Sequence, residues 1–173
     1  MKRSWLIAGI ITIALGSAAL FLGYRHFFGR KRYTNTIQRT LAIIKPDAVR
    51  AKNTGKIIDR AEHEGFTVVD LKKVQLDREQ VEQFYGEFRG KSWFNGMVDF
   101  MTSGPAVVMI LEKINAIPDW RDLIGSTDPR RAKDGTLRRQ FGTDIRHNAV
   151  QGSDNAENAL REIKFFFADR FKV

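Results

Sequence analysis

Residues 125–154 and the helix before them gather side chains that suit the recognition of phosphate. They are Arg121, Thr127, Arg130, Arg131, Lys133, Arg138, Arg139 and Asn148. Arginine presents a rigid fork of donors that matches phosphate oxygens. Long polar segments without secondary structure are uncommon inside compact domains and are usually functional. The region therefore predicts a site for a phosphate-bearing ligand, and a solvated basic loop is the alternative interpretation.

Lys45 adds a cation of the same sign directly after the apolar run of residues 40–44. Side chains that could act as nucleophiles are scarce. The chain has no cysteine, which excludes disulfides and thiolate chemistry. An imidazole is well suited to accept a phosphoryl group near neutral pH, and the histidines are His26, His63 and His147.

Apolar runs and helical repeats alternate along the part of the chain that carries these side chains. Residues 40–44, 66–76 and 106–111 are predicted strands, and the last is the most continuously apolar of them. Helices are expected at residues 56–64, after Asp77, at 93–101, at 120–124 and at 155–167. This alternation favours an α/β or α+β sandwich in which helices cover a sheet.

The formal net charge of +9 is concentrated at the N-terminus. Six of the 29 Lys and Arg residues lie in residues 1–32, which contain no acid, so the rest of the chain has 23 basic against 20 acidic residues. The charge therefore gives no reason to expect specific binding of nucleic acid.

Residues 5–24 are uncharged and mostly apolar. A helix of this length rises about 1.5 Å per residue, which is enough to span a hydrocarbon core of roughly 30 Å. The sequence thus predicts a membrane anchor at 1–32 that contacts lipid, a linker at 33–39 and a folded domain at 40–173. The basic flank predicts a single-pass protein with this domain on the cytoplasmic side, and a cleaved signal peptide is the alternative.

Several motifs resemble those of the nucleoside diphosphate kinase family, in order and with similar spacing. They are IIKPDAV (43–49), TSGP (102–105), GSTDPRRAKDGTLRRQFG (125–142) and NAVQGSD (148–154). Separate motifs in register are far more specific than one motif alone. The resemblance covers about residues 38–173. It implies a ferredoxin-like βαββαβ sandwich with an antiparallel four-stranded sheet, and assembly of identical chains into hexamers or tetramers.

The family moves a γ-phosphoryl group from a nucleoside triphosphate to a nucleoside diphosphate through a phosphohistidine. The resemblance therefore implies nucleoside di- and triphosphates as partners and Mg²⁺ as cofactor, held by the nucleotide phosphates without a direct protein ligand. It also implies that Phe94 stacks on the base, that Asn148 bonds the sugar, and that the cations and Thr127 hold the phosphates. The residues that match the family's nucleotide site are Lys45, Tyr85, Phe94, Arg121, Thr127, Arg138 and Asn148.

The family's histidine nucleophile belongs directly before the signature Gly152, Ser153 and Asp154, where this chain has Gln151. Glu162 matches the carboxylate that orients the histidine. A carboxamide nitrogen is neither basic nor nucleophilic, because its lone pair is delocalised into the carbonyl. We therefore predict that nucleotide binding is retained and that phosphoryl transfer is abolished or severely impaired.

Two alternatives to this prediction stay open. The chain is an active kinase in a corrected form if Gln151 results from engineering or a sequence error, or it is a non-catalytic subunit of a mixed oligomer. His147 is not expected to replace the missing histidine, because it precedes Gln151 by four residues and leaves the loop from a different point.

Overall fold

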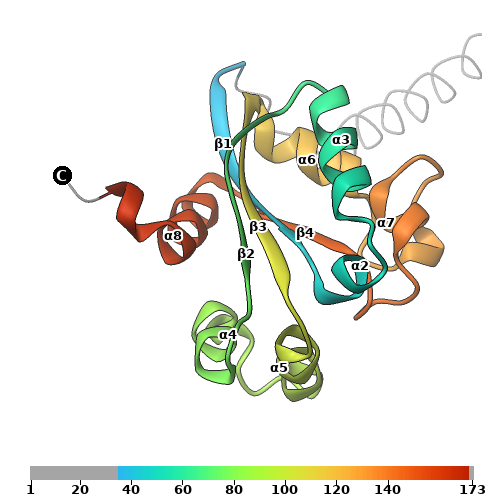
Figure 1. Ribbon diagram of the computed structural model, residues 1–173, viewed down its shortest axis with the longest axis vertical. Coiled ribbons are helices and arrows are strands. Elements are labelled where there is room, and N and C mark those ends of the chain that lie inside the picture. Colours follow the sequence, from blue (N-terminus) through green and yellow to red (C-terminus); the bar gives the residue numbers. More distant parts are fainter. Residues whose placement is uncertain (1–34, 172–173) are drawn as a thin grey trace, which may run out of the picture. The chain divides into compact units, whose positions relative to one another are not determined.

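The computed structural model describes residues 35–171, and in this part of the chain helices flank a four-stranded sheet (Figure 1). The strands are β1 (Ile37–Ile44), β2 (Thr67–Val74), β3 (Ala106–Ile114) and β4 (Val150–Gly152). Their order across the sheet is β2-β3-β1-β4, and each neighbouring pair is antiparallel.

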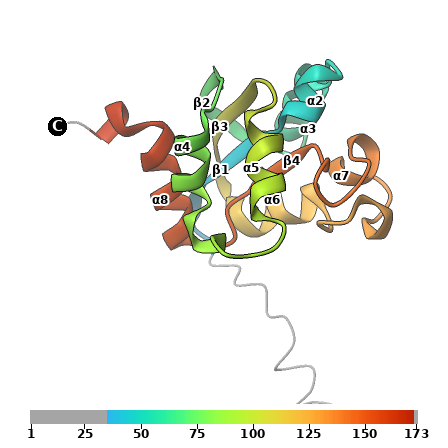
Figure 2. The ribbon, with the colours of Figure 1, turned by 90° about the horizontal axis from the view of Figure 1, so that it is seen from below.

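The helices are α2 (Pro46–Arg50), α3 (Thr54–His63), α4 (Arg78–Phe84), α5 (Phe94–Thr102), α6 (Ala116–Ile124), α7 (Leu137–Phe141) and α8 (Ala156–Phe166). The 3-10 turns are η1 (Gly86–Phe88), η2 (Pro129–Arg131) and η3 (Ala168–Phe171). The chain order β1-α3-β2-β3-α6-β4 confirms the predicted βαββαβ sandwich. Helices α4 and α5 are inserted between β2 and β3 and lie side by side (Figures 1 and 2).

An apolar layer on each face holds the helices to the sheet. Leu41 and Ile43 of β1 belong to the layer that includes α4, α5 and α8. Ala42 and Ile44 belong to the opposite layer, with α2, α3, α6 and α7. Successive side chains of β1 thus point to opposite faces, as the pleat of a strand requires. Because residues 41–44 of β1 are buried on both faces, this part of the strand is continuously apolar rather than alternating.

Several element boundaries differ from the sequence-based predictions, and two of these differences concern strands next to the site. Strand β1 begins at Ile37, so residues 37–39 belong to the sheet and not to the predicted linker. The region 125–154, predicted as a long loop, contains η2, α7 and the short strand β4. A strand of three residues is too short to display an alternating pattern, so its sequence does not distinguish it from a loop.

The predicted location in a membrane is corrected by the structure. Within residues 35–171, no helix is long and apolar enough to cross a bilayer. The apolar stretch 5–24 and the predicted anchor 1–32 lie outside the described residues.

Strand β4 is fixed in place by the indole of Trp120, which is fully buried on α6. The Trp120 Nε1 atom donates to the main-chain oxygen of Gln151 at 3.1 Å. A Cβ atom built on Gly152 would lie 2.2 Å from Trp120 Cδ1, closer than side chains can approach. The backbone of β4 therefore needs glycine at position 152 to reach the indole.

Replacing this glycine should destabilise the fold. Gly152→Ala is expected to lower the free energy of unfolding by about 1–3 kcal/mol, because the added methyl group overpacks a rigid site. The matched control is Gly55→Ala in α3, where an added Cβ has no neighbour within 4 Å and helix propensity favours alanine. Urea denaturation measures both variants. If both substitutions changed the free energy of unfolding by the same amount, the contact with Trp120 would not be the reason for glycine at position 152.

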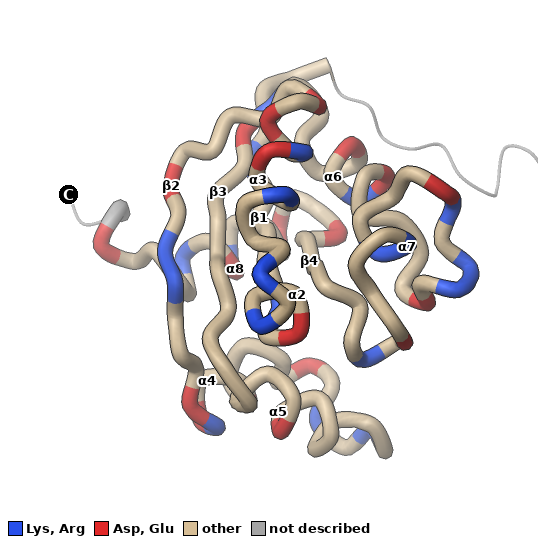
Figure 3. The backbone as a smooth tube through the Cα atoms, turned by 45° about the vertical axis from the view of Figure 1, so that its right-hand side comes forward, with Lys and Arg blue, Asp and Glu red and all other residues tan. Residues whose placement is uncertain are grey.

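The basic loop around α7 is tied to β4 through Arg138. Figure 3 shows Lys and Arg at several points along this loop. The guanidinium of Arg138 donates from Nε to the carbonyl of Val150 at 3.1 Å and from Nη1 to the carbonyl of Gly125 at 2.9 Å. These two bonds join α7 to the start of the loop and to the strand that carries Gln151.

Arg138→Met should therefore destabilise the fold beyond the loss of a surface charge. The variant leaves the carbonyls of Val150 and Gly125 without their donor, which we expect to cost about 2–4 kcal/mol of the free energy of unfolding. Arg139→Met is the neighbouring control, since Arg139 is exposed and pairs only with the exposed Asp134. Its effect should stay within about 0.5 kcal/mol. Thermal or urea unfolding measures the stability of both variants. Equal losses of stability would contradict the structural role of the two hydrogen bonds made by Arg138.

Candidate functional site

A cavity of about 810 Å³ lies between the α4–α5 region and the loop that carries α7, with β4 and α8 at its base. It is lined by most of the residues predicted for the site: Lys45, Tyr85, Arg121, Thr127, Arg138, Asn148, Gln151, Gly152, Asp154 and Glu162. Of the predicted residues, Phe94 and Ser153 are not part of this lining. The fold thus brings together side chains that are more than one hundred positions apart in the sequence.

Lys45 lies at the point where β1 ends and α2 begins, and its side chain is buried. Its Nζ atom donates to Asn148 Oδ1 at 2.8 Å and to the carbonyl of Arg146 at 2.6 Å, and it lies 4.8 Å from the centre of the Phe100 ring. Burial lowers the pKa of Lys45 to about 8. The ammonium group is thus held by neutral acceptors and remains able to bind an anion.

Arg121 and Arg138 bring two more positive charges to the same cavity. Burial, followed by the neighbouring guanidinium of Arg121, lowers the pKa of Arg138 to about 10. Among the ion pairs formed by residues 35–171, none includes Lys45, Arg121 or Arg138. Cations that repel each other and lack a carboxylate partner form a site for a polyanion.

Asn148 organises this end of the cavity. Its Oδ1 atom accepts from Lys45, and its Nδ2 atom donates to the carbonyl of Thr127 at 3.0 Å. The carboxamide therefore links the end of β1 to the basic loop. One hydrogen on Nδ2 is still available for a ligand.

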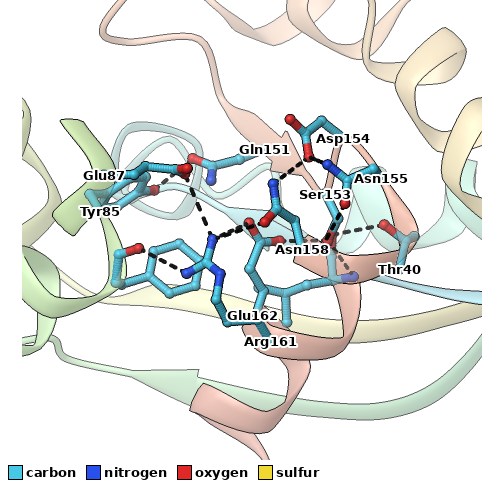
Figure 4. Close-up of polar contacts among 12 residues, drawn as sticks. Thr40, Tyr85, Glu87, Gln151, Ser153, Asp154, Asn155, Asn158, Arg161 and Glu162 are labelled. Atoms are coloured by element: carbon cyan, nitrogen blue, oxygen red, sulfur yellow. Dashed lines mark hydrogen bonds and ion pairs between the residues drawn. The ribbon is translucent and has the colours of Figure 1, made fainter.

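The side chain of Gln151 points from β4 towards Tyr85 (Figure 4). The hydroxyl of Tyr85 donates to Gln151 Oε1 at 2.6 Å. Burial raises the pKa of Tyr85, so its hydroxyl keeps its proton and remains a donor at neutral pH. Among the contacts of the described residues, the Nε2 atom of Gln151 has no hydrogen-bond partner.

Glu162 is a buried carboxylate on α8 and lies close to Ser153 (Figure 4). The hydroxyl of Ser153 donates to Glu162 Oε2 at 2.5 Å and accepts from the backbone N–H of Leu41 at 3.2 Å. Arg161 Nη2 lies 3.7 Å from Glu162 Oε1. Burial raises the pKa of Glu162 above its usual range. Ser153 thus does not line the cavity itself, but its hydrogen bond fixes the position of Glu162, which does.

Phe94 does not lie where the sequence-based prediction put it. It is only 5% exposed and packs in the core with Val98 and Met101, which follow it at helical spacing on α5. The preceding residue, Trp93, is 45% exposed and lines the cavity, with its ring 5.2 Å from that of Phe88. The apolar spacing of Phe94, Val98 and Met101 indicates an inward face, and this signal could have assigned Trp93 to the cavity.

Sequence reasoning also missed residues 145 and 146, a loop segment that lines the cavity next to α5. Arg146 and Ile145 line the cavity, and the guanidinium of Arg146 approaches Gly96 of α5 closely. The ring of His147 meets the edge of Phe100, with centres 4.6 Å apart, and its Nδ1 atom lies 2.9 Å from Asp144 Oδ2. Hydrogen bonds from the His147 backbone and ring lower the pKa of Asp144 to about 2.

Comparison with known proteins identifies relatives over the whole described domain. A family model described as nucleoside diphosphate kinase matches residues 38–171. A nucleoside diphosphate kinase of a Nitratiruptor species is 52% identical over 134 residues, which is 78% of this chain and 98% of that protein. One of Helicobacter pylori is 51% identical over 133 residues, covering 77% and 97% of the two chains.

Solved structures agree with this match. The nucleoside diphosphate kinase of Aquifex aeolicus superposes with a TM-score of 0.76 at 40% identity, covering 80% of this chain and 100% of that one. That of Halobacterium salinarum, solved in complex with CDP, superposes with a TM-score of 0.75 at 37% identity, covering 78% and 90%. From the matched family model, the identity and the shared fold, the chain belongs to the nucleoside diphosphate kinase family.

Proposed function

We propose that this chain binds nucleoside di- and triphosphates in the cavity, and that its phosphoryl transfer is severely impaired because Gln151 stands at the nucleophile's position. One observation carries the binding proposal: Lys45, Arg121 and Arg138 line the cavity, and within residues 35–171 none of them forms an ion pair with a carboxylate. Holding cations near each other and away from bulk water is unfavourable. The phosphates of a nucleotide would offset that cost.

The outer part of the cavity suits a base. Trp93 is half-exposed there, and Phe88, Met97 and Ile145 add apolar surface. An aromatic face stacks on any base, so we expect little preference among nucleotides. Trp93 takes the stacking role in this proposal, since Phe94 is in the core. The remaining hydrogen of Asn148 Nδ2 is the donor proposed for the sugar.

Mg²⁺ is proposed to enter with the nucleotide. Within residues 35–171, no group of three or more acidic, histidine or cysteine side chains is arranged to hold a metal ion. The residues that we assign to the phosphates are cations or neutral donors. The phosphate oxygens would therefore be the metal's ligands, and when bound it would neutralise part of their charge.

The proposed impairment follows from the chemistry of the amide. The surroundings of Gln151 are those of a well-organised catalytic position: the Tyr85 hydroxyl, the Trp120 indole and the pair formed by Ser153 and Glu162. An amide can accept the bond from Tyr85 as an imidazole would, but its nitrogen lone pair is delocalised into the carbonyl and cannot take up a phosphoryl group. Losing a covalent nucleophile has lowered kcat by about a millionfold in an enzyme where each group was removed in turn.

Assembly into an oligomer is part of the proposal, because β2 is an edge strand with exposed apolar side chains. Val69 and Leu71 are 37% and 41% exposed on it. An apolar edge strand is a ready surface for another chain. A second copy would cover it, and so would a catalytic relative if the chain served as a non-catalytic subunit.

The main test is to restore the histidine. Gln151→His should acquire acid-labile phosphate from γ-labelled ATP and transfer phosphate to a diphosphate at least about 1,000-fold faster than the parent chain. Gln151→Asn is the control, since it also alters the side chain but supplies no nucleophile. If the parent chain already acquires phosphate from ATP and transfers it to a diphosphate, the proposed impairment is wrong. If the revertant stays inert, the lost activity has a cause other than residue 151.

The second test uses the pH dependence of nucleotide binding. Lys45 is mostly charged at pH 7 and mostly neutral at pH 9, because its pKa lies near 8. Only the charged form attracts phosphate, so the association constant for ADP should fall about tenfold over this range. Lys45→Arg keeps its charge and should show no such fall, which also corrects for the ionisation of ADP itself. Isothermal titration with ADP measures the association constant of both proteins at each pH. If the two constants fell in parallel with rising pH, the fall would be due to a group other than Lys45.

A further inference from the structure

The family assigns Glu162 to the orientation of a histidine, and this chain has no histidine at position 151 for it to orient. The carboxylate nevertheless remains buried and lines the cavity. Its Oε2 atom accepts a hydrogen bond from the hydroxyl of Ser153, and the Arg161 guanidinium is 3.7 Å from Oε1, beyond hydrogen-bond distance. A buried carboxylate costs folding free energy, and nucleotide binding alone gives it no task.

The amide of Gln151 leaves a donor in the same cavity as this carboxylate. Tyr85 fixes the Oε1 atom of Gln151 at 2.6 Å, and the Nε2 atom has no partner among the described residues. Gln151 and Glu162 both line this cavity, and Figure 4 shows Gln151 next to Tyr85 and Glu162 next to Ser153. A donor and an acceptor that share a cavity with phosphate-binding cations can hold a water molecule.

We propose that this chain is a nucleoside triphosphatase in which Gln151 holds, and Glu162 deprotonates, the water that attacks the γ-phosphorus. The proposal rests on the nucleotide binding proposed above. It replaces transfer between nucleotides by transfer to water, which needs no covalent intermediate on the protein.

The geometry of water makes the two residues complementary. A water that accepts a hydrogen bond from Gln151 Nε2 and donates one to Glu162 retains one lone pair for attack on phosphorus. The Tyr85 bond prevents the amide from rotating away. A glutamine that orients water is also how GTPases cleave a γ-phosphate. Lys45, Arg121 and Arg138 would stabilise the charge that builds up on the phosphate oxygens.

The step balances without another reactant. The water oxygen forms a bond to the γ-phosphorus, and the bond from that phosphorus to the bridging oxygen breaks. The bonding electron pair leaves with the nucleoside diphosphate, and the water proton moves to Glu162. Inorganic phosphate departs, and Glu162 returns its proton to solvent. Burial raises the pKa of Glu162, which makes it a stronger base than a surface carboxylate.

The experiment measures release of inorganic phosphate from γ-labelled Mg-ATP by the full chain, present in excess over nucleotide. Arg121→Gln, purified in the same way, supplies the background from contaminating enzymes, because it weakens the phosphate site. The parent should release phosphate well above that background. Glu162→Gln should be slower by about a hundredfold, the usual size of a general-base contribution, while its affinity for ATP by titration stays within about twofold.

Glu157→Gln is the matched control for this variant. Glu157 lies on the same helix α8 and is exposed outside the cavity, so its change should leave phosphate release unaltered. Release from the parent no faster than background, with ATP bound, would overturn the inference and leave the proposed nucleotide binding intact. Release from Glu162→Gln as fast as from the parent would overturn it too. Failure to bind ATP at all would instead refute the proposed function.

A second measurement does not depend on any variant folding. The rate of phosphate release by the parent should rise with pH through the raised pKa of Glu162, since only the carboxylate accepts the proton, and then level off up to about pH 7, where Lys45 is still mostly charged. The charged groups that influence Glu162 are Arg161 on the same helix, Asp154 after β4 and Glu87 on η1, and the Ser153 hydroxyl and Tyr85 complete its surroundings. A rate that is flat across the titration of a carboxylate would contradict the role of Glu162.

Discussion

The pairing of β4 with β1 is the constraint on which the site depends. Strand β4 has three residues, and Gln151 lies opposite Ile43 in its ladder. So short a strand needs further support, which comes from the Trp120 indole on one main-chain oxygen and the Arg138 guanidinium on another. These contacts position residue 151 through its backbone. The side chain at 151 can therefore change without loss of the position.

The charges of the cavity depend on the same scaffold. Lys45 and Arg138 are held by carbonyl and amide oxygens, which fix their positions without neutralising them. A carboxylate paired with each cation would neutralise its charge, and the site would then bind anions poorly. The carboxylate of Asp144 also lines the cavity, and it accepts hydrogen bonds from the backbone N–H groups of Arg146 and His147 and lies 2.9 Å from the ring nitrogen of His147. Neutral acceptors thus make the cavity both ordered and electropositive.

The sequence predicted the sandwich and most of the cavity lining, for reasons that particular residues make clear. Strand β3 was evident because burial on both faces gives a continuous apolar run. Strand β4 was not, because its place depends on long-range contacts with Trp120 and Arg138 that no local pattern contains. Phe94 packs in the core and its neighbour Trp93 lines the cavity, since matching a motif does not show which of two adjacent aromatic rings faces inward. The predicted membrane location is not supported by the structure: no helix within residues 35–171 is long and apolar enough to cross a bilayer, and residues 5–24, on which the prediction rested, lie outside the described residues.

If Gln151 stands where a nucleophile is expected, as we propose, the residues around it can still take part in catalysis. Glu162 is kept ionisable in a buried place by the Ser153 hydroxyl, and that bond forms whatever side chain occupies position 151. With an imidazole there, the carboxylate would have a ring to orient. With an amide there, whose oxygen is fixed by Tyr85, the same carboxylate has a donor nearby and a cavity that can admit water. In this proposal, the side chain at position 151 decides which molecule can serve as the phosphoryl acceptor, because the groups that bind phosphate and the group that accepts a proton are held by contacts of their own.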